Sequence, residues 1–323
     1  MSVDLSVVSR RTALCWIAAV PGAVWAVVRG LGLDHGPVIQ LIAFTPYVTA
    51  GALVVAVVTL VLRRWRPAVL AVLAATALTA MVLPRALPDA DRGAGGGPEL
   101  RVMTSNVLGG GADPDALVAL IRAYEVDVLA IQEFTQDVAD ELEARGAGAL
   151  LPYRQLHPIN SAAGSALYSR YPLTDVGVRV HTSGFAQAYG TVSVPGAVPV
   201  LAESVHPMAP WGAPVLDDWR EDLGNEPRAM PDGPVRLLLG DFNSTLDHSP
   251  LRALVASGYR DAADATGMGL AGTWGPYDGD PIPPVQLDHV LADARIRIES
   301  LRVLRLPGSD HRPVLVTMTL PPG

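Results

Sequence analysis

The stretch Ser309-Asp310-His311-Arg312-Pro313, near the C-terminus, is the most informative part of this chain. It is the last of five polar motifs in a fixed order, after Thr104-Ser105-Asn106, Ile131-Gln132-Glu133, Gly240-Asp241-Phe242-Asn243 and Gln286-Leu287-Asp288-His289. Each motif adjoins an apolar run typical of a buried β-strand. The polar side chains are therefore expected to emerge together at one rim of a sheet. Carboxylates, amides and imidazoles gathered in this way are the groups that a divalent cation and a phosphate ester need.

Strand-like and helix-like segments alternate from Glu99 onward. The predicted strands are residues 100–105, 126–131, 165–169, 190–194, 198–205, 235–239, 285–291 and 312–320. Helices are predicted over 114–124, with Asp113 as the N-cap before Pro114, and over 250–256. This alternation predicts an α/β fold.

The apolar residues are unevenly distributed. Mean hydropathy is +0.29, and the excess lies almost entirely before residue 84. The chain has no lysine, and residues after 92 contain 16 arginines against 28 acidic residues, a net charge of −12. Such an acidic domain is a poor non-specific binder of polyanions, although a nuclease whose metal supplies local positive charge is not excluded.

Residues 12–28, 38–62 and 67–83 are three uncharged apolar runs that predict three transmembrane helices. The second is the longest, and Pro21 in the first is tolerable in a membrane helix. We therefore divide the chain into a membrane segment, residues 1–92, and a catalytic domain, residues 93–323, with a flexible glycine-rich linker over 92–98.

The arginine distribution predicts the orientation. Two arginines precede the first run and three lie between the second and third, against three on the opposite side. This bias favours a cytoplasmic N-terminus. We expect a multi-pass protein of the cell membrane whose catalytic domain lies outside the cytoplasm, with no obligate protein partner evident.

Two of the motifs supply candidate metal ligands. Glu133 follows an apolar strand, and a carboxylate at a strand end suits Mg²⁺, or Mn²⁺ as the alternative, because these cations prefer oxygen ligands. Asn106 is similarly placed and is expected to orient a neighbouring carboxylate or to contact the metal. Taken alone, each residue is also compatible with an ordinary strand end or turn.

Asp241 and Asn243 flank Phe242, so in an extended segment their side chains face the same way. An aspartate in this setting can hold an attacking water and accept its proton, and an asparagine can position the water or a phosphate oxygen.

Asp288 and His311 suggest a carboxylate–imidazole pair that would stabilise negative charge on a phosphate. Asp310 is a candidate metal ligand or a further partner of the histidine. His206, at the end of an apolar run, is a candidate phosphate contact. His289 is expected to face away and be structural, and four further histidines are interpreted as ordinary loop or surface residues: His35, His157, His181 and His248.

The ordered set of motifs resembles the endonuclease/exonuclease/phosphatase, or DNase I-like, superfamily. Smaller matches are Ser169-Arg170-Tyr171-Pro172 and Gly272-Thr273-Trp274, and the resemblance covers about residues 99–320. It implies a four-layer α-β-β-α sandwich with Mg²⁺ at one end of the paired sheets. The residues that it implies are Glu133, Asn106 and Asp310 for the metal, and His206, Asp241, Asn243, Asp288 and His311 for catalysis.

This resemblance implies a metal-dependent hydrolase of phosphate esters: a nuclease, phosphodiesterase or phosphatase. Nucleic acid, a phospholipid head group and a small phosphoester remain open as substrates. His206 stands where repair nucleases carry a tyrosine, which favours the DNase and sphingomyelinase pattern. The alternative is a catalytically silent module that binds a phosphorylated ligand or a partner, and the completeness of the motif set argues against it.

Overall fold

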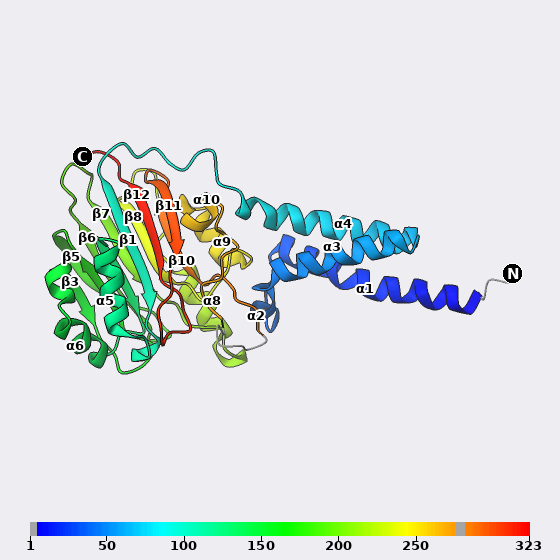
Figure 1. Cartoon of the computed structure of the whole chain (residues 1–323), viewed down its shortest axis with the longest axis horizontal. Coiled ribbons are helices and arrows are strands. Elements are labelled where there is room, and N and C mark those ends of the chain that lie inside the picture. The colour runs from blue at the N-terminus through cyan, green and yellow to red at the C-terminus, as the bar shows by residue number, and fades with distance from the viewer. Residues whose placement is uncertain (1–4, 276–281) are drawn as a thin grey trace.

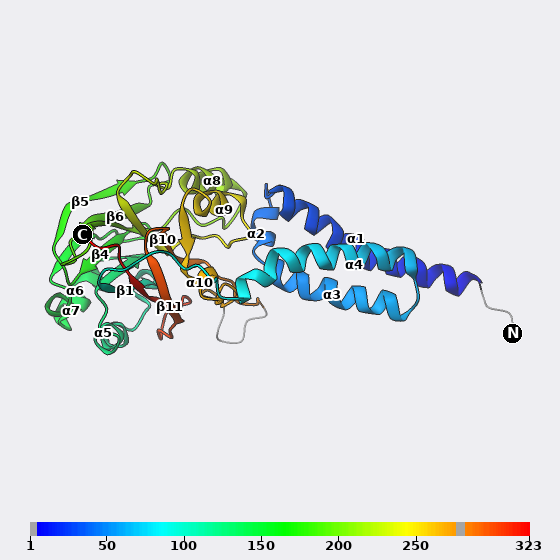
Figure 2. The same ribbon diagram turned by 90° about the horizontal axis from the view of Figure 1, so that it is seen from above.

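The computed structural model describes residues 5–275 and 282–323. A bundle of N-terminal helices and a β-sandwich lie end to end (Figures 1 and 2). The bundle consists of α1 (Leu5–Leu31), α3 (Thr45–Val61) and α4 (Trp65–Val82), and the short α2 (Val38–Ile42) lies between it and the sandwich. Small side chains at the helix contacts allow close approach. These are mainly alanines: Ala19, Ala26, Ala52, Ala56, Ala71 and Ala75.

Among the described residues, two segments are long and apolar enough to cross a membrane, judged by length and composition: Arg10–Leu31 and Trp65–Ala86. The single helix expected over residues 38–62 is wrong, because the chain divides at Ala43 and Phe44 into α2 and α3. Pro46 explains the division. It fits the first turn of α3 but cannot donate a hydrogen bond to a preceding helical turn.

The described residues after the bundle form two six-stranded sheets, ordered β11-β12-β1-β2-β4-β3 and β5-β6-β7-β8-β10-β9. Each contains one parallel pair, β1 with β2 and β7 with β8, among antiparallel neighbours. The strands are β1 (Glu99–Asn106), β2 (Val128–Gln132), β3 (Tyr153–His157), β4 (Ser165–Ser169), β5 (Leu173–Val180), β6 (Ala186–Val192), β7 (Val200–Val205), β8 (Val235–Asp241), β9 (Tyr259–Asp261), β10 (Asp288–Asp293), β11 (Arg297–Val303) and β12 (Val314–Thr319).

Helices cover the outer faces of both sheets. The first sheet packs against α5 (Pro114–Ala123), α6 (Gln136–Ala144) and α7 (Ala147–Leu150), and the second against α8 (Leu216–Gly224) and α9 (Ser249–Val255). The remaining short elements are α10 (Ala262–Ala265) and 3-10 turns at Leu83–Ala86, Leu108–Gly110 and Ala213–Val215. The predicted four-layer α-β-β-α sandwich is confirmed.

Burial on both faces explains why the strands read as continuous apolar runs. In β1, Leu100 and Val102 belong to the core between the two sheets, whereas Met103 belongs to the core beneath α5. Asp113 caps α5 as predicted, since its carboxylate accepts hydrogen bonds from the N–H groups of Asp115 and Ala116.

The glycine-rich segment over residues 92–98 is not the flexible linker expected from its composition. It runs from α4 along the sandwich to β1 (Figure 1). Ile298 donates a backbone hydrogen bond of 2.9 Å to Arg92, and Gly97 donates one of 2.8 Å to Leu320. A side chain at Gly93 would collide with the carbonyl of Ile296, so glycine permits close packing here.

The strand registers bring the polar motifs to one rim. Asn106 pairs with Gln132 at the ends of β1 and β2, and Asp288 pairs with Asp241 across β10 and β8. Val205, the residue before His206, lies beside Gly240. The strand ends therefore deliver side chains from both sheets to a single place.

Candidate active site

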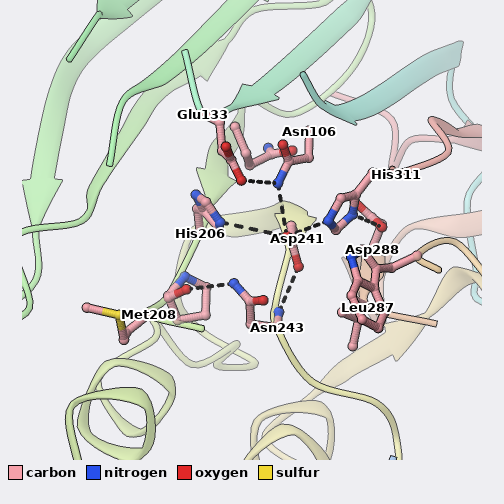
Figure 3. A network of polar contacts seen from close by, with 12 residues as sticks. Asn106, Glu133, His206, Met208, Asp241, Asn243, Leu287, Asp288 and His311 are labelled. Carbon is pink, nitrogen blue, oxygen red and sulfur yellow. Dashed lines mark hydrogen bonds and ion pairs between the residues drawn. The ribbon is translucent and has the colours of Figure 1, made fainter. Parts of the chain in front are cut away.

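Asn106 joins the two sheets at this rim. Its Nδ2 donates to Glu133 Oε1 and to Asp241 Oδ2, each at 3.1 Å (Figure 3). Its Oδ1 accepts a hydrogen bond of 2.9 Å from the N–H of Leu108. Both ends of the amide are thus engaged, and Asn106 holds a carboxylate from each sheet in a fixed position.

Glu133 and Asn243 have left-handed backbones, with φ of 56° and 47°. Non-glycine residues rarely adopt this conformation, and it is concentrated at functional sites. At both positions it turns the chain sharply just after a strand. Burial raises the pKa of Glu133, and the hydrogen bond from Asn106 partly offsets the increase.

His311 is held between two carboxylates. Its Nδ1 lies 2.8 Å from Asp288 Oδ2, and its Nε2 lies 3.4 Å from Asp241 Oδ2 (Figure 3). Burial opposes the charged imidazolium, but Asp288 and Asp241 outweigh it and raise the pKa of His311 to about 10. The ring is therefore cationic at neutral pH, and both of its nitrogens carry protons.

His206 approaches Asp241 from the other side, with its Nε2 3.7 Å from Oδ2. Its ring stacks edge-on against Phe185, with centroids 5.0 Å apart. Burial lowers the pKa of His206 to about 4, since the attraction of Asp241 is too weak to compensate. His206 is therefore neutral, and the site contains one charged and one uncharged imidazole.

Asp241 lies at the centre of this arrangement and is almost completely buried. Burial raises the pKa of its carboxyl despite the nearby positive charge of His311. The backbone N–H of Asn243 donates to Asp241 Oδ1 at 2.9 Å, and the Asn243 amide donates to the carbonyl of Pro207 at 3.0 Å. Trp219 also fixes this turn through a 3.0 Å hydrogen bond to the carbonyl of Asn243.

Carboxylate oxygens suitable for a hard cation are present on both sides of Asp241. Asp310 accepts a 3.0 Å hydrogen bond from Trp274 Nε1 through Oδ2. Its Oδ1 is buried and has no hydrogen-bond partner among the described residues. One ligand atom each of Asp241, Asp288 and His311 also lie within 4.8 Å of one another, which makes a candidate acidic metal cluster. A cationic His311 has no free nitrogen lone pair, so the carboxylates are the better donors.

A cavity of about 500 Å³ opens at this rim. Its polar side comprises Glu133, His206, Asp241, Asn243, Asp310 and His311. The remaining lining is largely apolar, and part of it comes from α2 and the α2–α3 junction rather than from the sandwich. Six of the eight predicted site residues thus line the cavity. The other two contact lining residues: Asn106 bonds to Glu133 and Asp241, and Asp288 bonds to His311.

The positions of the other five histidines agree only in part with those expected from the sequence. His289 bonds to Asp261 at 2.6 Å and to the carbonyl of Ser244 at 2.9 Å, away from Asp241, as expected of a structural residue. His181 and His248 lie in loops, as expected, but both are buried, so neither is a surface residue. His35 is exposed and His157 is half-buried.

His181 and His248 are buried because each has polar partners. His181 lies 3.2 Å from Glu226 and 3.5 Å from Asp222. His248 accepts the N–H of Thr245 on Nδ1 at 2.9 Å, and its Nε2 lies 2.8 Å from the carbonyl of Ile39 in α2. Apart from Thr245, these partners are distant along the chain, so no local sequence signal marks them.

Three supporting residues were not assigned roles from the sequence. Thr273 Oγ1 accepts the N–H of Asp288 at 2.9 Å, Trp274 donates to Asp310, and Ser309 Oγ donates to the carbonyl of Asn106 at 2.9 Å. The Gly272-Thr273-Trp274 and Ser309-Asp310-His311 motifs contained the signal, and only the geometry reveals what these side chains hold.

Several solved structures share this fold. An endonuclease/exonuclease/phosphatase from Beutenbergia cavernae DSM 12333 matches 69% of this chain and 72% of its own, with a TM-score of 0.53 and 20% identity. A humanised D. rerio TDP2 matches 68% of this chain and 98% of its own, with a TM-score of 0.55 and 15% identity. An endonuclease/exonuclease/phosphatase family protein from Bacteroides thetaiotaomicron matches 70% of this chain and 99% of its own, with a TM-score of 0.52 and 14% identity. At these identities the likeness establishes the fold alone.

A comparison of the sequence with curated proteins gives no match. The family model described as "Endonuclease/Exonuclease/phosphatase family" matches residues 103–311, which is more than half of the chain and includes every predicted site residue. The resemblance inferred from the motifs is confirmed. This chain belongs to the endonuclease/exonuclease/phosphatase family.

Proposed function

We propose that this protein is a membrane-tethered, Mg²⁺-dependent phosphoesterase that hydrolyses a phosphodiester or phosphomonoester by in-line attack of water. The family's members are generally phosphoester hydrolases. The observation that carries the proposal is the setting of Asp241: buried at the rim, fixed by Asn106, and approached by His206 and His311.

In this mechanism Asp241 orients the attacking water and accepts its proton. A bond forms between the water oxygen and phosphorus while the bond to the leaving oxygen breaks, and the leaving oxygen takes the electron pair. The N–H of Asn243 fixes Asp241 from its other oxygen. Oδ1 of Asp241 is thus engaged by the backbone, and Oδ2 is the oxygen that Asn106, His206 and His311 approach.

His311 and His206 stabilise the negative charge that develops on the phosphate oxygens. His311 supplies a charged N–H, with Asp288 holding its other nitrogen, and His206 supplies a neutral N–H donor. Asn243 contributes its side chain to phosphate binding. Preorganised donors stabilise developing charge more strongly than the same groups in solution, because they need no reorganisation during the reaction.

A bound divalent cation, Mg²⁺ or Mn²⁺, would neutralise phosphate charge and polarise a P–O bond. Glu133 and Asp310 would hold it through carboxylate oxygens, and the unpartnered Oδ1 of Asp310 supports this assignment. Asn106 has both amide atoms engaged, so its part in this proposal is to orient Glu133.

We place residues 1–92 in the membrane as a multi-pass segment and residues 93–323, the catalytic domain, outside the cytoplasm. Arg63, Arg64 and Arg66 lie at the turn between α3 and α4, which is at the end of the bundle remote from the sandwich (Figure 1). The N-terminal end of α1, with Arg10 and Arg11, lies at the same end. The positive-inside bias then puts this end in the cytoplasm and the sandwich on the opposite side.

The test uses the full chain in detergent, assayed with Mg²⁺, Mn²⁺ or EDTA. Substrates are bis-p-nitrophenyl phosphate, plasmid DNA, sphingomyelin and inositol phosphates. Metal-dependent turnover that is lost in a folded Asp241→Asn variant is the expected result. No turnover of any of them, with the fold intact and metal bound, would favour a silent phosphate-binding module.

A further inference from the structure

The cavity has an apolar wall that the proposed chemistry does not use. Ile39, Ala43 and Phe44, from α2 and its junction with α3, line it together with Phe185, Trp211 and Leu287 of the sandwich. A phosphate group and a metal need none of these side chains. The wall therefore indicates something about the rest of the substrate.

The α2 part of this wall is anchored to the sandwich by polar contacts. Gln40 Nε2 donates to the carbonyl of Pro210 at 2.7 Å, and the carbonyl of Ile39 lies 2.8 Å from His248 Nε2. Just before α2, Asp34 accepts hydrogen bonds from the backbone N–H and the hydroxyl of Ser249 at 2.8 and 2.5 Å. These contacts hold α2 in place as one side of the cavity.

The position of α2 also determines how far the cavity lies from the proposed membrane. It connects α1 to α3 at the end of the bundle nearest the sandwich (Figures 1 and 2), which in the proposed topology is the membrane boundary. Trp211 is 68% exposed and Tyr47 is 44% exposed beside this junction. Tryptophan and tyrosine are enriched at membrane–water interfaces, because one part of each ring is apolar and another is polar.

We propose that the substrate is a phosphoester carrying a hydrocarbon chain, taken from the lipid bilayer, and that Phe44 is a specificity-determining residue for that chain. The phosphate lies at Asp241 and His311, and the first carbons of the chain lie against Ile39, Ala43 and Phe44. This inference rests on the proposed function. A polynucleotide is disfavoured because the domain is acidic and this wall offers it no cations.

The test compares hexadecyl and methyl p-nitrophenyl phosphate, which share the leaving group and differ only in the chain. The full-length protein is reconstituted in nanodiscs, and release of p-nitrophenolate gives kcat/KM for each ester. We expect the wild type to prefer the hexadecyl ester by at least tenfold. Phe44→Ala should reduce this preference by roughly tenfold, because apolar pocket contacts discriminate on that scale. Leu41→Ala, an exposed residue of α2 outside the cavity lining, is the matched control and should retain the preference.

A binding experiment separates the two proposals. Asp241→Asn is titrated with hexadecylphosphonate and methylphosphonate, and tryptophan fluorescence is followed. Equal use of both esters, or a preference that survives Phe44→Ala, overturns the inference and leaves the phosphoesterase intact. Chain-dependent binding that requires Phe44, without turnover of either ester, overturns the phosphoesterase alone. Absence of both turnover and chain-dependent binding overturns the phosphoesterase proposal and the hydrocarbon-chain inference together.

Discussion

His311 and His289 are both buried imidazoles with a carboxylate on Nδ1, and they differ in what their second nitrogen meets. His311 Nε2 faces Asp241 at the cavity, whereas His289 Nε2 is satisfied by the carbonyl of Ser244. A cationic donor directed into the cavity can act on a substrate. His289, whose two nitrogens bond to Asp261 and Ser244 away from the cavity, supports the fold.

This difference predicts contrasting variants. His311→Ala should lower kcat by roughly 10²–10⁴-fold while remaining folded, because it removes a donor that acts in the transition state. His289→Gln should lower the melting temperature, since it disturbs buried hydrogen bonds, and should leave kcat of the folded fraction close to wild type. Steady-state kinetics and thermal unfolding on the same preparations would separate the two effects. A comparable loss of kcat in His289→Gln would show that the roles are assigned to the wrong histidine.

Glu133→Gln tests the proposal that Glu133 is a ligand of the divalent cation. The amide keeps the shape and can still bond to Asn106, but one carboxylate of the proposed pair is lost. We expect the Mg²⁺ concentration for half-maximal activity to rise about 10–100-fold, measured by metal titration after EDTA treatment. Glu143→Gln, an exposed acidic residue of α6 distant from the rim, serves as the control. An unchanged Mg²⁺ requirement in Glu133→Gln would remove this residue from the metal site.

At the scale of elements, Gly240 shows how closely β7 and β8 approach. A Cβ on this residue would lie 1.8 Å from the carbonyl oxygen of Val205. Since this pair delivers both His206 and Asp241 to the rim, the absence of a side chain at Gly240 is a requirement of the site as well as of the sheet.

Gly240→Ala should therefore destabilise the protein by about 4 kcal/mol or more, because backbone atoms cannot relax around the new methyl group. Gly224→Ala, at the end of α8 with no neighbour within 4 Å of the added Cβ, is the matched control. It should be neutral or stabilising by up to about 1 kcal/mol. Thermal unfolding in detergent measures both, and equal melting temperatures for the two variants would contradict the packing argument.

Each central strand was predicted, although β6 was expected over 190–194 and spans Ala186–Val192, and all four edge strands were missed. β4 has the predicted bounds, because both of its faces are buried and every residue contributes to an apolar run. β3 and β5 were missed because they lie at sheet edges and are partly exposed, so their sequences alternate weakly. The rim residues were predictable since they lie at or near the ends of central strands. The α2 wall was not, because it depends on contacts between segments far apart in the chain.

At the scale of the whole molecule, a buried charge cluster joins the helix bundle to the sandwich. Asp247, six residues after Asp241, accepts two hydrogen bonds from Arg85 at 2.7 and 2.8 Å and one from Arg29 at 2.8 Å. Burial works against its charge, but the two arginines prevail and lower the pKa of Asp247. The loop that carries Asp241 and Asn243 is thus continuous with the loop that fixes the sandwich to the bundle.

Asp247→Asn should destabilise the protein by about 3–5 kcal/mol, because two buried arginines lose their counter-charge. The pH dependence has a definite sign. A carboxyl with a depressed folded-state pKa stabilises fully above its unfolded pKa of about 3.9 and loses this contribution as pH falls through the folded value. The difference in melting temperature between wild type and variant should therefore be constant from pH 6 to 8 and shrink below about pH 4. A difference that grew in acid would contradict this account.

The packed segment over residues 92–98 has a consequence for how such an enzyme would find its substrate. Seven residues of free chain could extend up to about 25 Å and let the sandwich move freely above the membrane. Here they pack along β11 and the end of β12 instead. The proposed anchoring then fixes the height of the cavity as well as its orientation. The search for substrate becomes lateral diffusion in two dimensions, and its rate should depend on the surface density of the lipid rather than on any bulk concentration.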